Sequence, residues 1–408
     1  MEHDNAGGFI YRLPEPAKAH SVLRIPGSHT LYAGPPACMR RHALNAAEHG
    51  MSREVSFLSV TETDIALGKF EALIRNAVGQ LAERLAPSPR IFYIAVFCID
   101  DLIGTDEAAL ISSLTSAFPA FQFAVHRIDP ISLSRTKAMS AGKQSGLYSF
   151  IKPTGLHDNG INFLGTFVTL EPECEILELL RRWGCAPVRE LFRCKSYEEY
   201  QDMGKSRASV VMRFIAEDAA RQMKDRLGIP FCVMEPSYNA FEVAEGYKRL
   251  AELLEQEEPD FSEELSAAKK DVEATVKALS DIPMAIDAKA SLMPFSTAKA
   301  LLDYGFDLRY IFRSAASYEP CPEKNAAEYI AEHYPNVQVF RLGNAKTLQV
   351  SNVPQNLIAI GNECAKYLNA RYCADMWHDE GYFGFHGIHR LMALLRKAAE
   401  KEETYGNT

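Results

Sequence analysis

Two cysteines stand where a thiolate could bind a metal. Cys38 follows the turn Gly34-Pro35-Pro36 and precedes a helix-like stretch, and Cys98 follows the apolar run Ile91–Phe97. The glycine has no Cβ and the prolines have no backbone N–H, so the turn keeps the backbone close to whatever Cys38 contacts. A cysteine at a helix N-terminus with two arginines close after it is expected to have a depressed thiol pKa, and the thiolate is the metal-binding form.

Both cysteines follow a predicted strand, Thr30–Ala33 for Cys38 and Ile91–Phe97 for Cys98. A helix predicted between them would make one right-handed crossover and place the two strand ends at one sheet edge. Ligands of open α/β sheets bind beyond this edge. The alternative is that both are buried small hydrophobes, a common fate of free cysteine. The matched positions and the Gly-Pro-Pro turn favour ligands.

Short apolar strands alternate with amphipathic helices along the chain, which is typical of an α/β fold. Further strands are predicted at Val55–Val60, Phe121–His126, Ile161–Phe167, Ser209–Phe214, Phe231–Met234, Pro283–Asp287, Leu308–Phe312, Gln338–Arg341, Leu357–Ile360 and Arg371–Cys373. Helices are predicted at Asp64–Leu85, Glu107–Ala117, Glu173–Trp183, Glu217–Leu227, Ala240–Glu257, Ser262–Leu279, Phe295–Tyr304, Ala326–His333 and Gly387–Glu402.

The alternation divides into three blocks, each predicted to hold one parallel sheet. We expect a first α/β domain at 1–155 that carries both cysteines, a second Rossmann-like domain at 156–280 that includes a charged helical connector, and a third Rossmann-like domain at 281–408 with the last helix. A chain of 408 residues is long enough for several domains.

Composition excludes several classes of protein. The net charge is −9 and no Lys/Arg stripe is present, which argues against nucleic-acid binding. No signal-peptide pattern opens the sequence and no apolar run approaches the ~20 residues of a membrane span, so a cytoplasmic, non-membrane protein is expected. The nine cysteines are scattered without a Cys-x-x-Cys pair, which favours neither a disulfide framework nor a zinc knuckle.

The sequence resembles the component 1 proteins of nitrogenase and of nitrogenase-like reductases. In the first block the resemblance is carried by Gly34-Pro35-x-x-Cys38, by Thr61-Glu-Thr-Asp64 followed by Gly68 and Leu73, and by Cys98-Ile-Asp-Asp-Leu-Ile-Gly104-Thr-Asp106. Later it is carried by Ile161-Asn-Phe-Leu-Gly165, Leu227-Gly-Ile-Pro230-Phe, Ala240-Phe-Glu-Val-Ala and Gly381-Tyr-Phe-Gly-Phe-His-Gly387. Their order over most of the chain makes the match more specific than any one segment.

The resemblance implies a nitrogenase-like oxidoreductase with three Rossmann-like domains around a central cleft. It implies an iron–sulfur cluster at a subunit interface, with Cys38 and Cys98 as ligands, and a reductase partner that delivers the electrons. That partner is a P-loop ATPase iron protein with its own cluster. This sequence has no Gly-x-x-x-x-Gly-Lys-[Ser/Thr] loop, so we expect ATP to be used by the partner only.

The sequence departs from the nitrogenase pattern in its cysteines. No cysteine precedes Cys38, so an eight-iron cluster is not expected. A [4Fe–4S] cluster usually has four protein ligands, and a homodimer would supply Cys38 and Cys98 twice. A heterodimer with a similar chain, or a histidine ligand such as His20 or His29, remains an alternative.

The ligands of the nitrogenase active-site cofactor also have no counterpart. The matching second-domain strand reads Val210-Val-Met-Arg213 without cysteine, and Cys373, His378 and His386 are out of register with the cofactor histidine. We therefore expect no molybdenum–iron cofactor and no nitrogen fixation, and an organic substrate or a smaller metal centre in the cleft. His386 is interpreted as a structural hydrogen-bonding residue.

Six polar residues are candidates for substrate contacts: two follow the strand predicted at Phe121–His126, and four lie at predicted strand ends of the other two domains. They are Lys143, Tyr148, Arg213, Asp287, Lys289 and Arg313. The alternative is that they cap helices or form surface pairs. The sequence assigns no catalytic residue.

Three functions compete. The first is an iron–sulfur-dependent reductase component of unknown substrate, and the second is a scaffold on which a metallocofactor is assembled without substrate turnover. The third, a two-lobed small-ligand-binding protein, usually carries a secretion signal and gives the cysteine pair no role.

Overall fold

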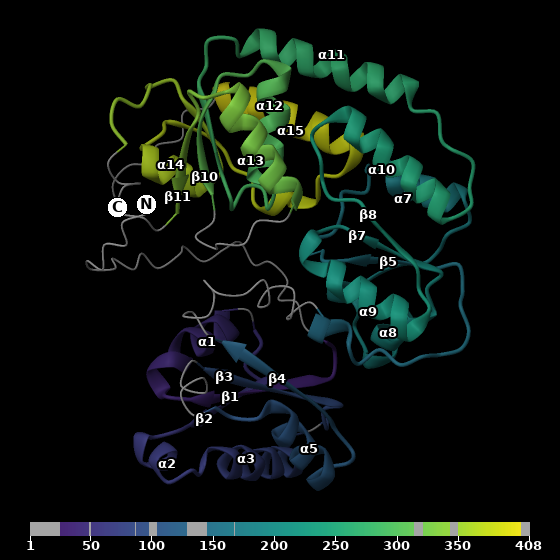
Figure 1. Cartoon of the computed structure of the whole chain (residues 1–408), viewed down its shortest axis with the longest axis vertical. Coiled ribbons are helices and arrows are strands. Elements are labelled where there is room, and N and C mark those ends of the chain that lie inside the picture. The colour runs from purple at the N-terminus through teal and green to yellow at the C-terminus, as the bar shows by residue number, and fades with distance from the viewer. Residues whose placement is uncertain are drawn as a thin grey trace.

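The structure is a computed structural model of the chain. It describes residues 25–48, 50–85, 87–97, 104–128, 145–166, 168–313, 321–342 and 350–400, with only the backbone at Cys321 and Glu380. Within these ranges the strands form three sheets in which every pair is parallel, so the predicted α/β class with Rossmann-like parallel sheets is confirmed. Figure 1 shows the first sheet at the bottom, with the second and third above it.

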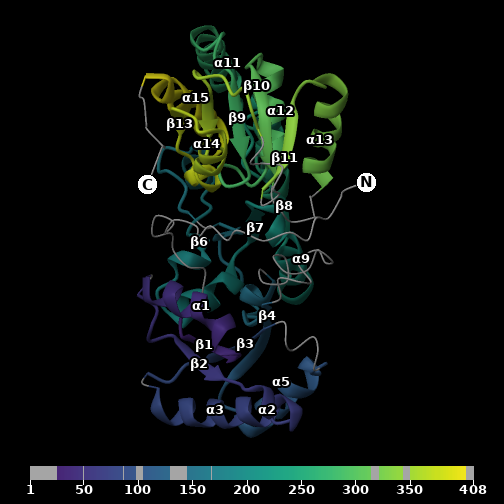
Figure 2. The same ribbon diagram turned by 90° about the vertical axis from the view of Figure 1, so that its left-hand side faces the viewer.

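The first sheet has the strand order β2-β1-β3-β4. These strands are β1 (Ser28–Gly34), β2 (Val55–Ser59), β3 (Ile91–Phe97) and β4 (Gln122–Ile128). Alternate strand residues such as Leu31 and Ile94 form a core with α3 (Phe70–Arg84) and α5 (Glu107–Ala117). The helix α1 (Pro36–Glu48) lies on the other side of the sheet, toward the rest of the molecule (Figures 1 and 2).

The helix predicted at Asp64–Leu85 is two helices. The first, α2 (Glu62–Ala66), ends before Gly68, which has φ +63°, and α3 follows it. The Thr61 hydroxyl accepts a hydrogen bond from the Asp64 amide, and the Asp64 carboxylate accepts one from the Thr61 amide. The Thr-Glu-x-Asp segment is therefore a capping box that starts a helix.

The second sheet has the order β6-β5-β7-β8. Its strands are β5 (Ile161–Leu164), β6 (Val188–Glu190), β7 (Ala208–Val211) and β8 (Phe231–Val233). One face packs on α9 (Glu217–Leu227) and on α8 (Tyr197–Asp202), in a core that also contains Ile91 and Tyr148. Segments of the first block therefore share a core with the second sheet.

The third sheet has the order β11-β10-β9-β12-β13. Its strands are β9 (Met284–Asp287), β10 (Leu308–Arg313), β11 (Gln338–Arg341), β12 (Ile358–Ile360) and β13 (Tyr372–Ala374). Its helices are α11 (Ser262–Ala278), α12 (Pro294–Tyr304), α13 (Cys321–His333), α14 (Asn362–Leu368) and α15 (Gly384–Glu400).

One hydrophobic core joins the second and third sheets. It includes side chains of α7 (Glu175–Arg182) and α10 (Ala240–Leu253) and extends from Ile161 to Ala398. Strands such as β5 and β9 are buried along their whole length, as expected of a parallel sheet covered on both faces. The sheets lie within the three predicted segments, whose boundaries stay a prediction.

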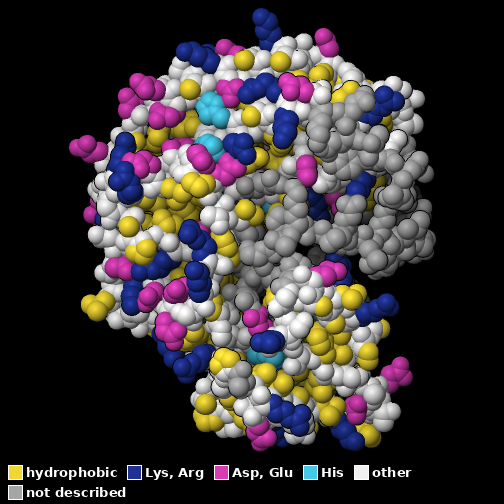
Figure 3. All heavy atoms as spheres, turned by 180° about the vertical axis from the view of Figure 1, so that it is seen from behind, with side chains coloured by type: hydrophobic (Ala, Val, Ile, Leu, Met, Phe, Trp, Pro, Cys, Tyr) yellow, Lys and Arg dark blue, Asp and Glu magenta, His cyan; other side chains and the backbone are white. Residues whose placement is uncertain are grey.

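Charged side chains show no large region of one sign on the face seen in Figure 3, where basic and acidic groups are interspersed. Among the described helices, none combines the length and apolar character that a membrane crossing requires.

Candidate functional site

Each sheet has a point at which its strand order reverses, and ligands of open α/β sheets bind at the carboxyl end of such a point. The reversal lies between β1 and β3 in the first sheet, between β5 and β7 in the second, and between β9 and β12 in the third. Several of the predicted site residues lie at these three edges.

Cys38 lies at the edge of the first sheet. β1 and β3 are parallel neighbours with Ala33 opposite Val96, as predicted, so the chain leaves both strands at the same place. Cys38 is half-buried in the first turn of α1, and its amide donates to the Pro35 carbonyl at 3.0 Å. Cys98 lies outside the described residues, so the approach of the two sulfur atoms stays a prediction.

Aromatic side chains surround this edge. His42 lies one helical turn after Cys38 on the same face of α1, and its ring stacks on Tyr32 with 5.0 Å between centroids. Tyr32 also stacks on Phe57 of β2 at 5.2 Å. Phe57 of β2 is 39% exposed and Leu44 of α1 is 56% exposed, so the helix that carries Cys38 and the edge strand of this sheet each leave a large apolar side chain accessible to solvent.

His29, one of the alternative cluster ligands, lies at the opposite end of β1 from Cys38. Its imidazole is buried, and Nε2 is 2.9 Å from the Ser56 hydroxyl. Burial lowers the pKa of His29 to about 4. This position argues against His29 as a ligand of the cluster. The other alternative, His20, lies outside the described residues.

Arg213 lies at the edge of the second sheet, two residues after the end of β7. It is buried, and burial lowers the pKa of its guanidinium. Its Nη2 donates to the His378 carbonyl at 2.6 Å, and its Nη1 is 3.8 Å from Oδ2 of the buried Asp379. Tyr148 reaches the same edge, because its hydroxyl accepts from the Gly165 amide at 3.5 Å.

His378 and Asp379 join the second-sheet edge to the third. The His378 amide donates to the Lys289 carbonyl at 2.7 Å, and the Asp379 amide donates to the Ala290 carbonyl at 2.8 Å. Both have a positive φ, +47° and +63°, which L-residues rarely adopt. Strained backbone of this kind concentrates at binding sites, and neither residue carries a sequence signal for it.

Asp287 lies at the edge of the third sheet, where it is fully buried. Its carboxylate accepts from the amides of Lys289 at 2.7 Å, Ala290 at 2.9 Å and Cys364 at 2.8 Å. Burial raises the pKa of Asp287, and these three hydrogen bonds oppose the rise. Its oxygens hold the backbone at the start of α14, which matches the helix-capping alternative for this residue.

The remaining candidate substrate contacts differ in their exposure to solvent. Lys289 is exposed and Arg313 is half-buried at the end of β10, next to Asp287 in the sheet. Lys143 lies outside the described residues. The structure thus brings Arg213 and the backbone of Lys289 together through His378 and Asp379, and keeps Cys38 at a separate edge.

Glu190, at the end of β6, is a buried acid without any sequence signal, because the strand before it is short. Burial raises the pKa of Glu190 to about 7, and its Oε1 has no hydrogen-bond partner within the described residues. Among the other described cysteines, Cys174, Cys185 and Cys364 are buried and Cys232 is half-buried.

Comparisons with known proteins fit this architecture. Residues 17–401 match the profile of a family described as nitrogenase component 1 type oxidoreductase. A solved structure titled "Nitrogenase Cp1 at pH 6.5" superposes with a TM-score of 0.70 at 17% identity, covering 93% of this chain and 90% of that chain. A second, "Nitrogenase Cp1 at pH 5", gives 0.60 at 14% identity, covering 93% and 86%. No curated protein matches the sequence.

Proposed function

Since the chain belongs to the nitrogenase component 1 type oxidoreductases, we propose that it is a reductase component that receives electrons through an interface iron–sulfur cluster. The observation that carries this proposal is the edge of the first sheet. There the half-buried Cys38 starts a helix beside the neighbouring strand that leads directly into Cys98.

The residues at this edge fit an iron–sulfur cluster. Cys38 forms no disulfide and is partly accessible, and the first turn of a helix favours a thiolate. When bound, the cluster would supply one-electron transfer, and Cys38 and Cys98 would hold it. Two ligands per chain fit one [4Fe–4S] cluster shared by a homodimer, or by a heterodimer with a similar chain.

Exposed apolar side chains on the helix of Cys38 and on the edge strand of the same sheet support a shared cluster. Leu44 of α1 and Phe57 of β2 are exposed although each is a large hydrophobic side chain. Exposed apolar groups of this kind are typical of contact surfaces between subunits. A second subunit that covers them would also place its own cysteines near Cys38.

We propose that electrons come from a P-loop ATPase iron protein, and that ATP is used by that partner only. The substrate, whose identity is open, would bind near the strained residues His378 and Asp379. Arg213, Lys289 and Arg313 are the candidate contacts, together with Lys143. The buried Tyr148 and Asp287 would act by holding the backbone around them.

A molybdenum–iron cofactor is not part of this proposal. At the end of β7 the chain offers Met212 and Arg213 where the nitrogenase pattern has its ligand-bearing segment, and Arg213 is engaged with His378. The alternative function is a scaffold for metallocofactor assembly. It would bind a cluster or a precursor and release it, without consuming electrons.

The experiment is the iron and acid-labile sulfide content of anaerobically purified protein, with its electron paramagnetic resonance spectrum after reduction. We expect about two irons per chain, which is half of a four-iron cluster. Cys38→Ala and Cys98→Ala should each remove the iron and the signal. The matched control is Cys232→Ala, which removes a half-buried cysteine of β8 and should leave both unchanged.

Iron that survives in Cys38→Ala would overturn the ligand assignment. The scaffold is distinguished by incubation with the ATPase partner, MgATP and dithionite. A reductase component keeps its cluster through repeated redox cycles, whereas a scaffold loses it stoichiometrically to an acceptor protein.

A further inference from the structure

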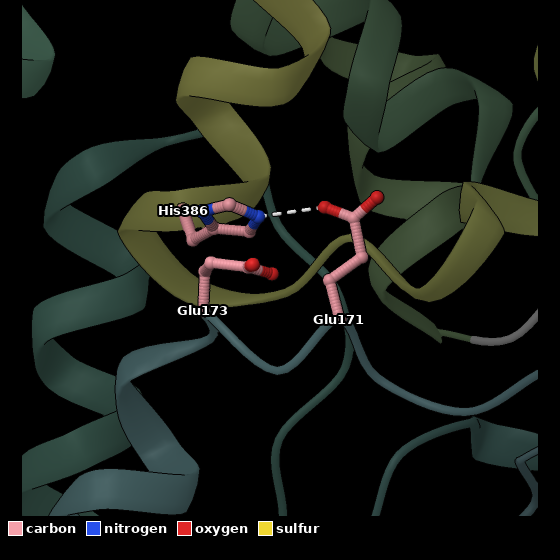
Figure 4. Close-up of side chains that lie close together, drawn as sticks. All are labelled: Glu171, Glu173 and His386. Atoms are coloured by element: carbon pink, nitrogen blue, oxygen red, sulfur yellow. Dashed lines mark hydrogen bonds and ion pairs between the residues drawn. The ribbon is translucent and has the colours of Figure 1, made fainter.

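Glu171, Glu173 and His386 form a cluster apart from the sheet edges described above (Figure 4). One ligand atom from each lies within 4.8 Å of the others, and His386 Nε2 is 2.6 Å from Glu171 Oε2. The glutamates lie on the turn before α7, and His386 lies in the first turn of α15. We propose that these three side chains bind a divalent first-row transition metal ion.

The donor atoms of Glu171, Glu173 and His386 suit such an ion. One imidazole nitrogen with two carboxylate oxygens is a donor set that Mn²⁺, Fe²⁺ and Zn²⁺ accept, and three protein ligands leave positions for water. His386 and Glu171 are half-buried and Glu173 is exposed, so an ion can enter from solvent. Glu173 forms no hydrogen bond or ion pair within the part of the chain that the structure describes.

The backbone holds the ligands in place without a metal. The Glu175 carboxylate accepts from the amides of Phe385 at 2.6 Å and His386 at 3.2 Å, and from the Tyr247 hydroxyl at 2.8 Å. This acid follows Glu173 by two residues, so it fixes His386 against the turn that carries the glutamates. Gly384 makes the approach possible, because a Cβ there would collide with the Glu175 carboxylate.

The charges at the site favour a cation. Arg390 donates to Glu171 at 2.8 and 3.0 Å and lies over the Tyr382 ring. Glu173 adds a second carboxylate beside this ion pair, and Glu175 adds a third at the start of α7. Within the described residues, the carboxylates of this segment therefore outnumber the arginine that pairs with Glu171. A carboxylate has lone pairs enough to bind a metal and keep its arginine.

A bound ion would connect two parts of the molecule. The turn before α7 belongs to the second-sheet region, and α15 packs against α11 and β13 of the third. An ion held by both would stabilise their contact, because only the folded chain presents the complete ligand set.

The test is a titration of the full-length chain with Mn²⁺, followed by the electron paramagnetic resonance signal of the free ion. Mn²⁺ is the probe because thiolates prefer softer metals, which keeps the cysteines from competing. We expect one Mn²⁺ per chain, and at least tenfold weaker binding in Glu173→Gln and in His386→Asn. Glu252→Gln, which removes an exposed carboxylate of α10, should bind as the unaltered chain does.

Thermal unfolding gives a second readout. Mn²⁺ should raise the Tm of the unaltered chain and of Glu252→Gln, and should leave that of Glu173→Gln unchanged. Glu173 is exposed and unpaired in the described structure, so its variant should fold even where His386→Asn does not. Absence of stoichiometric binding, or equal affinity in Glu173→Gln and Glu252→Gln, would overturn the proposal. Cys38→Ala should keep the Mn²⁺ site, which separates this inference from the cluster.

Discussion

The edges of the first and third sheets carry polar residues at equivalent places, and the fold uses them differently. Cys38 follows the reversal point of the first sheet, is half-buried, and lies in α1, which also carries the exposed Leu44. Asp287 ends the central strand of the third sheet, is fully buried, and accepts three backbone hydrogen bonds. A strand-end position therefore predicts where a polar side chain lies. The hydrogen bonds that the side chain already makes decide whether a ligand can bind to it.

The largest effect is expected from Asp287→Ala. It would leave the amides of Lys289, Ala290 and Cys364 buried without an acceptor, and each such loss costs about 1–3 kcal/mol. We expect the free energy of unfolding to fall by roughly 3–5 kcal/mol in urea denaturation. Asp287→Asn keeps one acceptor oxygen and should lose less. A loss below about 1 kcal/mol in Asp287→Ala would show that these bonds matter little.

One glycine at each of these edges, Gly34 in the first sheet and Gly361 in the third, allows a direct comparison of the two. Gly361, with φ +106°, would place an added Cβ 2.5 Å from the Asp287 carboxylate, so Gly361→Ala combines backbone strain with a collision. We expect a loss of about 2–4 kcal/mol. The three atoms nearest to an added Cβ at Gly34 all belong to the Phe97 ring, and Gly34 has no positive φ, so Gly34→Ala should cost only about 1 kcal/mol. Chemical denaturation of the pair measures the difference, and equal losses would contradict it.

His29 makes the first-sheet region sensitive to acid. Its pKa is about 4 in the fold and 6.5 when exposed, so the unfolded chain takes up the proton first as pH falls. Stability is therefore unaffected above pH 6.5 and is lost between pH 6.5 and 4, by up to about 3 kcal/mol. His29→Gln should remove this part of the pH dependence.

The control for that measurement is His333→Gln, which alters an exposed histidine of α13 and should keep the loss. Urea midpoints at pH 7, 5.5 and 4.5 for the three proteins give the comparison. If His29→Gln follows the unaltered chain at every pH, the buried imidazole is not the source.

Cys38→Ala should have the smallest effect on stability. The side chain is half-buried and its removal leaves the helix start intact, so the free energy of unfolding of the iron-free protein should change by less than about 1 kcal/mol. Its iron content should nevertheless fall to background. Asp287→Ala should show the reverse pattern, with lower stability and a retained cluster in the folded fraction. Denaturation curves and iron analysis of both variants measure the two effects. Loss of both stability and iron in the same variant would contradict the prediction.

Much of the fold follows from local patterns in the sequence. Apolar runs such as Ile91–Phe97 predict buried strands at their observed positions. The sequence does not predict β6, because Val188-Arg-Glu190 is short and two of its three residues are charged, so no alternation is visible. The sequence does not predict α14, because the amide of Cys364 in its first turn is held by Asp287, far away in the sequence, and not by a neighbouring cap.

The candidate sites also include residues that have a local sequence signal and residues that only long-range contacts bring together. Cys38 has a local signal, since the Gly-Pro-Pro turn and a helix start surround it. Glu171 and His386 are 215 residues apart and meet only because α15 returns to the turn before α7. The sequence predicts a hydrogen-bonding role for His386, and its bond to Glu171 agrees with that role, but the sequence does not indicate the partner. The positive φ of His378 and Asp379 likewise results from long-range contacts.

The position of α15 has a consequence for synthesis on the ribosome. This helix packs on α11, on β13 and on α7, and its first amides are held by Glu175. The first sheet can close its own core once β4 has emerged, because that core draws on residues from Leu31 to Phe123. The core shared by the second and third sheets must wait for residues 384–400. Nascent chains halted before that point would expose the apolar side of α7, and they are where chaperone binding should concentrate.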